Sequence, residues 1–170
     1  LNLHIPGNET STEVYFDDLT YTTNVPQATV SSVNWGVDAS GGWNGVSNWS
    51  PGLVPDSNDL VVNFTSAITA PRTVFTDSDV TAKSINFDSA SAYSVVGLGT
   101  VNLEAVTGTA SIQVSQGSHE FQAVVSLQSN ATADIADGTT LTFNNALNLN
   151  GNTLTQTGGG TLAINNMLHS

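Results

Sequence analysis

The carboxylates that lie close together in this sequence could support two kinds of chemistry. They form four pairs: Asp17 with Asp18, Asp56 with Asp59, Asp77 with Asp79, and Asp134 with Asp137. A glycosidase needs two carboxylates that face each other across a cleft, whereas neighbouring aspartates in turns more often satisfy the turn backbone or lie in solvent. Calcium binding is the sharper hypothesis, because Ca²⁺ accepts carboxylate and carbonyl oxygens from loops. The best calcium candidates are Asp77 and Asp79, followed by Asp17 and Asp18.

The histidines and serines give no pattern of a catalytic site. His4, His119 and His169 lie in unrelated segments, and His119 falls in the turn sequence GSHEF, where a polar, outward-facing residue is expected. No nucleophile-elbow motif is present around any serine. The chain has no cysteine, which excludes thiolate metal sites and disulfides. We therefore expect a protein that is not an enzyme and that needs no cofactor, with calcium as the one candidate ion.

The three tryptophans have two interpretations. Trp35, Trp43 and Trp49 lie within one segment rich in Gly, Asn, Ser and Pro. Exposed indole rings at Trp43 and Trp49 would form a stacking platform for a sugar. Alternatively, the tryptophans cover one end of a repetitive β-structure, which would otherwise expose its core and its unpaired strands. The cap is favoured, and the sugar platform is kept as the alternative.

The charge balance excludes several classes of partner. Two basic residues, Arg72 and Lys83, stand against 14 acidic ones, giving a formal net charge of −12. A nucleic-acid surface needs clustered Lys and Arg, and an anionic membrane attracts basic segments. No apolar run is long enough to span a bilayer. With few basic residues and no thiol, the chain suits a place outside the cell, so we expect an extracellular or cell-surface protein.

The composition predicts an all-β fold. Ser, Thr and Asn account for 59 of the 170 residues, and Val, Thr, Ser and Asn are poor in helix interiors. From Leu60 onward the chain becomes a series of short alternating segments bounded by Gly, Asn or Asp. Such a series is typical of β-strands separated by tight turns.

A repeat of about 20 residues favours a β-solenoid, which is a parallel β-helix. Segments that start with glycine can be aligned at Gly99, Gly117, Gly138 and Gly159, each followed by two further short strands. The apolar positions are mostly Val, Leu, Ile and Ala, which stack well from coil to coil. Residues 60–170 would supply about five coils, a rod on the order of 25 Å long. A β-sandwich or jelly roll is the alternative, although it usually has longer strands and more core aromatics.

Residues 34–166 resemble the autotransporter-associated β-strand repeats of large bacterial surface and secreted proteins. The resemblance rests on WNGVSNWSPGLVPDSNDLVVNF, on GSHEFQAVVSLQS and, most specifically, on NTLTQTGGGTLAIN. It implies a right-handed parallel β-helix, a bacterial origin and an extracellular location. Proteins with such repeats serve as adhesins, stalks and spacers, so the resemblance implies no single activity. We expect these residues to lack the translocator barrel and the anchoring segment of that family, and to end within a coil.

The first residues are expected to form a separate element. Residues 1–23 show two alternating segments and resemble the closing strands of a jelly-roll module of the carbohydrate-binding type. Residues 24–32 form a linker, and residues 33–170 form the solenoid with its cap at 33–59. Residues 1–23 have no obvious sheet of their own and are a candidate docking segment. Their apolar side chains Val14, Phe16, Leu19 and Tyr21 are candidates for assembly contacts.

These observations lead to two hypotheses about function. The last 32 residues, from Thr139, contain no Asp, Glu, Lys or Arg, so a regular and uncharged strand stack would be open to further strands. The chain is then a structural rod or fibre subunit whose partner is another copy, joined head to tail, or a neighbouring segment of a longer chain. The alternative is a carbohydrate-binding or spacer module of a secreted protein that acts on polysaccharides, with a polysaccharide as its partner.

Overall fold

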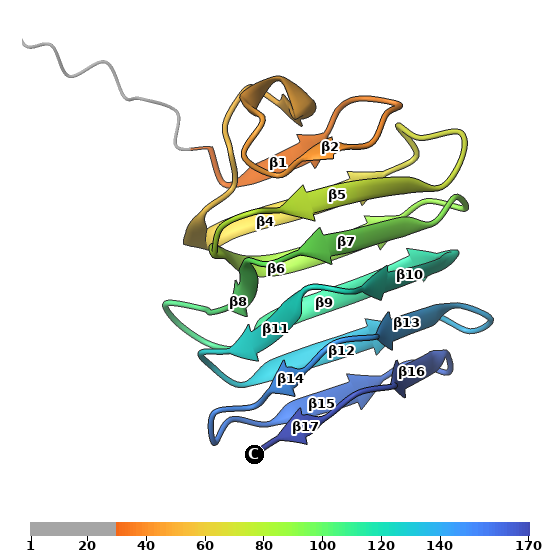
Figure 1. Ribbon diagram of the computed structural model, residues 1–170. Helices are drawn as coiled ribbons and strands as arrows, with labels where there is room; N and C mark the ends of the chain where they lie inside the picture. Colours follow the sequence, from red (N-terminus) through yellow and green to blue (C-terminus); the bar gives the residue numbers. More distant parts are fainter. Residues whose placement is uncertain (1–29) are drawn as a thin grey trace, which may run out of the picture.

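Short β-strands make up nearly all of the regular structure in the computed structural model, which describes residues 30–170 (Figure 1). The strands wind into about five stacked coils, and neighbouring coils pair through parallel strands. The predicted all-β solenoid is therefore confirmed, and the sandwich alternative is wrong. The chain forms these strands because apolar and polar residues alternate along them, which places one set of side chains inside and the other outside.

Each coil contributes strands to three faces. The first face consists of β1 (Ser32–Trp35), β4 (Ser57–Thr65), β6 (Val80–Asp88), β9 (Ala110–Gln116), β12 (Ala131–Ile135) and β15 (Leu154–Thr157). The second face is a six-stranded sheet of β2 (Gly41–Gly42), β5 (Arg72–Thr76), β7 (Tyr93–Gly97), β10 (Ser118–Phe121), β13 (Thr140–Phe143) and β16 (Thr161–Ile164). The third face consists of β8 (Thr100–Leu103), β11 (Val124–Leu127), β14 (Leu147–Asn148) and β17 (Leu168–His169).

The long strand β6 joins the first and third faces into one 11-stranded sheet. Its first residues pair with β8, and its last residues pair with β9. This arrangement corrects the glycine alignment. The strand after Gly99, β8, pairs with β11 rather than with β10, because the second-face strand of that coil is β7. The strands after Gly117, Gly138 and Gly159 do form one row, β10, β13 and β16.

The core lies between the three faces and consists of columns of like residues. Each column is set by strand register, which places residues of neighbouring coils side by side. Three of these columns are Val33, Val62, Ile85, Ile112 and Ala133 on the first face; Val74, Val95, Phe121, Phe143 and Ile164 on the second; and Val80, Val101, Val125, Leu147 and Leu168 on the third. Stacked phenyl rings add to this order, with Phe121 and Phe143 at 5.4 Å between ring centroids.

The N-terminal end of the described solenoid is covered. Strand β3 (Trp49–Ser50) runs antiparallel to β1, and a short 3₁₀ helix, η1 (Val46–Asn48), precedes it. The rings of Trp35 and Trp43 lie 5.1 and 5.2 Å from the ring of Trp49. All three tryptophans are at most 3% exposed, so the indoles close the core at this end.

Candidate functional site

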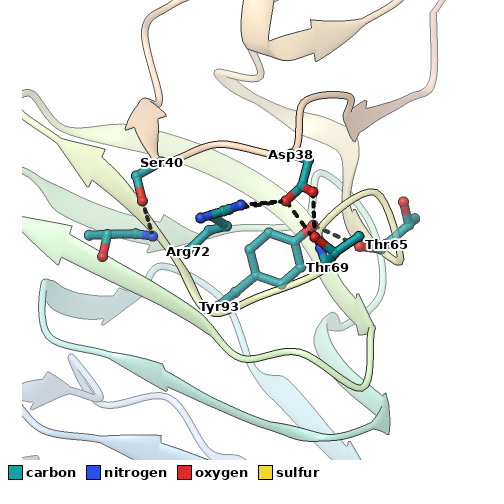
Figure 2. A network of polar contacts seen from close by, with 7 residues as sticks. Asp38, Ser40, Thr65, Thr69, Arg72 and Tyr93 are labelled. Atoms are coloured by element: carbon teal, nitrogen blue, oxygen red, sulfur yellow. Dashed lines mark hydrogen bonds and ion pairs between the residues drawn. The ribbon is translucent and has the colours of Figure 1, made fainter.

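A polar network ties the covered end to the coil beneath it (Figure 2). Asp38, in the loop after β1, accepts hydrogen bonds from Thr69 N at 3.1 Å and from Thr69 Oγ1 at 2.6 Å. The Arg72 guanidinium on β5 donates from Nε at 3.0 Å and from Nη2 at 2.9 Å to the same carboxylate. Ser40 Oγ accepts from Thr73 N at 2.9 Å. The network therefore joins the β1–β2 loop to β5 at several points.

Hydrogen bonds determine the charge state of this network. The bonds from Thr69, together with those from Arg72, lower the pKa of Asp38 to about 2, from an ordinary value of 3.8. Both partners of the ion pair remain in contact with solvent, with side-chain exposures of 29% for Arg72 and 37% for Asp38. Beside them, the Tyr93 hydroxyl donates to Thr65 O at 2.7 Å, and burial raises the pKa of this phenol. The donors of Thr69 and Arg72 all point at the Asp38 carboxylate, so this part of the network is a structural clamp.

The other carboxylates that are paired in the sequence lie at several places along the strands. Asp56 and Asp79 precede β4 and β6, Asp59 lies within β4, and Asp134 lies within β12 with Asp137 in the turn after it, whereas Asp17 and Asp18 lie outside the described residues. Asp79 Oδ1 accepts from Thr100 N at 2.8 Å, and Asp56 Oδ1 accepts from Thr81 N in the same way at 2.8 Å. Each bond joins one coil to the next, so these aspartates serve as backbone acceptors between coils.

The calcium candidates Asp77 and Asp79 flank Ser78 in the turn between β5 and β6. Asp79 is engaged by the Thr100 amide, and Ser78 Oγ accepts from Asn44 Nδ2 at 2.7 Å. Among residues 30–170, no three His, Cys, Asp or Glu side chains are grouped as a metal ion would require. The calcium site stays a prediction, and the geometry of the described residues does not add to it.

The sugar-stacking candidates lie in the core. Trp43 is 0% exposed and Trp49 is 3% exposed, and Trp43 Nε1 donates to Pro55 O at 2.7 Å. A stacking platform needs an open ring face, which neither indole offers in this conformation. The assembly candidates Val14, Phe16, Leu19 and Tyr21 lie outside the described residues.

His119 is the position where the expectation from sequence is wrong. It is 2% exposed, and its ring stacks on Phe87 with centroids 4.6 Å apart. The alternation within GSHEF carries the signal, because Phe121 points inward and His119 lies two residues before it on the same face of β10. The glycine before the segment suggested a turn, but the turn ends at Gly117 and the strand begins at Ser118.

A shallow hollow of about 290 Å³ lies on the second face near His119. It is lined by Ala92, Ser94, Ser118, His119, Glu120 and Thr142. Its one carboxylate, Glu120, accepts hydrogen bonds from Ser94 Oγ at 2.7 Å, Gln122 Nε2 at 2.6 Å and Asn144 Nδ2 at 2.7 Å. These donors come from three successive coils, so Glu120 joins the coils together.

The other end of the described solenoid is open. Strands β15, β16 and β17 pair with the preceding coil on one side only. Ile164, Met167 and Leu168 are 37%, 61% and 52% exposed there. Gln156 occupies the register position of Ala133 and Ile112, which are fully buried in earlier coils, and its Nε2 donates to Gly160 O at 2.9 Å.

Comparisons with protein-family models, curated proteins and solved structures found no match to this chain. Within residues 30–170 there is no helix whose length and apolar character would allow it to cross a membrane.

Proposed function

We propose that this chain is a non-catalytic structural protein found outside the cell or on the bacterial cell surface. Its coils form a rigid rod, and copies join head to tail into a fibre. The observation that carries the proposal is the β15–β17 coil. Among the described residues its strands pair only with the preceding coil, its apolar side chains are exposed, and no Asp, Glu, Lys or Arg occurs from Thr139 onward.

Backbone geometry supports strand addition at this end. The outer edge of a β-strand presents N–H and C=O groups that bind another strand, as in recognition by β-augmentation. In the described coils every step along the rod repeats the same parallel pairing, so an added strand would continue an existing register. Most natural sheets protect such an edge with charged residues, which this coil lacks.

The covered N-terminal end argues against a joint at the described first coil. Strand β3 and helix η1 lie over the core at that end, so the open coil of one copy cannot stack on the described first coil of another. We assign the joint to residues 1–23 of the next copy. Their alternating Val14, Phe16, Leu19 and Tyr21 provide the apolar positions that a strand on this edge needs.

Electron microscopy of the purified chain tests the proposal. We expect regular filaments from the full chain and monomers from a chain that lacks residues 1–23. Leu168→Glu places a negative charge on this coil, which would face the acidic residues of 1–23, and it should also abolish filaments. Val46→Glu is the matched control, because Val46 is 54% exposed at the covered end, and it should leave filaments intact. Monomers in every sample, or filaments that persist after the truncation, would overturn head-to-tail joining.

A further inference from the structure

His119 lies at a tight corner in the middle of the rod. It follows the turn between β9 and β10, and its side chain enters the core beneath Tyr93 and Phe87. The interplanar angle with Phe87 is 14°, so the two rings stack face to face. Gly117, with φ of +75°, forms the corner, and a Cβ there would overlap the carbonyl oxygen of Ser89. The corner therefore has little room for rearrangement.

Two backbone groups determine the protonation state of the imidazole. Tyr93 N donates to His119 Nδ1 at 3.1 Å, and His119 Nε2 lies 2.8 Å from Gln116 O. An amide N–H only donates and a carbonyl only accepts, so the ring must be neutral with its proton on Nε2. In the regular ladder between β7 and β10, Ser94 pairs with Glu120 and Val95 pairs with Phe121. The bond from Tyr93 N to His119 Nδ1 therefore extends the contact between these two strands by one residue beyond the ladder.

Protonation would break this contact. A proton on Nδ1 would face the N–H of Tyr93, placing two donors against each other, and the positive charge would be buried. Loss of the contact would leave the Tyr93 amide without the acceptor that holds β7 to the β9–β10 corner.

On the surrounding elements, three of the charged or titratable groups make polar contacts of their own, and the fourth, Lys83, lies on β6 four residues before Phe87. On β6, Asp88 accepts from Gln116 Nε2 at 2.7 Å, and on β10, Glu120 accepts from its three polar partners. On β7, the Tyr93 hydroxyl binds Thr65 O, and on β13 the register partner of His119 is Leu141. Burial lowers the pKa of His119 from its ordinary 6.5, although the carbonyls of Gln116 and Ser89 oppose the shift.

We propose that His119 makes the β9–β10 corner acid-sensitive: the neutral ring holds this corner to β7, and its protonation at acidic pH releases it. A neutral buried histidine contributes stability that is complete above pH 6.5 and declines below it, because the unfolded chain then binds the proton that the folded chain excludes. The unfolding equilibrium constant should rise by at most about tenfold per pH unit until the folded-state pKa is reached.

Urea unfolding between pH 7.5 and pH 4.5 tests this inference. Carboxylates, above all glutamates with an ordinary pKa of about 4.3, begin to protonate at the acid end of this range, and their contribution is common to all the chains compared. We expect the wild-type chain and His169→Gln to lose stability together on acidification, because His169 is exposed. His119→Gln should be less stable at pH 7.5 but should show a much flatter pH dependence. An equal pH dependence in all three chains would overturn the proposal.

Two measurements on the wild-type chain decide the matter if His119→Gln does not fold. In an NMR titration, with signals assigned by comparison with His4→Gln and His169→Gln, His119 should titrate below 6.5. In hydrogen exchange corrected for intrinsic rates, amides of residues 89–93 and 116–121 should exchange faster at pH 5 than at pH 7.5, relative to those of β13. An ordinary His119 titration, or unchanged relative protection, would overturn the proposal.

Discussion

Asp38 shows how single carboxylates hold this molecule together. Thr69 donates to it from both its backbone and its hydroxyl, and Arg72 donates from two guanidinium nitrogens. Charge-assisted hydrogen bonds of this kind are stronger than neutral ones. Asp56 and Asp79 make simpler versions of the same contact, each to one backbone amide.

The first prediction concerns Asp38→Asn. This variant should lower the urea midpoint at pH 7, because the amide cannot replace the charged acceptor of Arg72. The pKa of Asp38 is lowered to about 2, so its contribution is present above the ordinary 3.8 and is lost as pH falls toward 2. Wild-type and variant stabilities measured from pH 7 to pH 2 should therefore converge at the acidic end. Asp77→Asn, at an exposed turn, is the control and should track the wild type throughout.

The sequence predicts that Asp79 uses its carboxylate as an oxygen ligand, together with Asp77, but it does not predict the partner. In the structure the Asp79 carboxylate accepts a hydrogen bond from the amide of Thr100 in the next coil. That contact joins residues that only strand register brings together, which a spacing along the chain does not reveal. The clamp of Asp38 and Arg72 was missed for the same reason, since 34 positions separate the two residues.

At the scale of elements, alternation predicted the short strands and the parallel stacking correctly. Three of the four glycines used for the alignment are also placed correctly, because Gly117, Gly138 and Gly159 each precede a strand of the second face. The alignment failed at Gly99, where the glycine precedes a third-face strand instead. Glycine marks a sharp corner, and a coil with three faces has several corners, so glycine position alone cannot assign a strand to its face.

The second prediction compares two corner glycines with positive φ. Gly97, at +153°, lies beside Thr76 of the preceding coil, and a Cβ there would overlap the Thr76 carbonyl oxygen. Gly138, at +77°, has open space around the same position. Gly138→Ala should cost about 1–2 kcal/mol from backbone strain alone. Gly97→Ala adds a clash with backbone and should cost roughly 3 kcal/mol. Chemical denaturation of both variants checks the order, and equal losses would contradict the tight packing at Gly97.

At the scale of the whole molecule, charge is distributed unevenly along the rod. All 14 acidic residues lie at or before Asp137, and the two basic residues are Arg72 and Lys83. The proposed joint would bring residues 1–23, with Glu9, Glu13, Asp17 and Asp18, onto a coil that has no charged partner for them. It would therefore gain no ion pair, while two chains of charge −12 approach each other.

The third prediction follows from this distribution and concerns salt. The Debye length falls from about 30 Å at 0.01 M to about 3 Å at 1 M ionic strength, so salt screens repulsion between acidic copies. Because the proposed joint depends on strand pairing and apolar contact, the assembled fraction measured by sedimentation should rise with salt across this range. Leu168→Glu should remain monomeric at low salt, since its added charge must be desolvated in the joint and repels the acidic residues of 1–23. Assembly that is strongest at low salt would instead indicate attraction between opposite charges, and the joint would have to lie at Arg72 or Lys83 rather than at the uncharged coil.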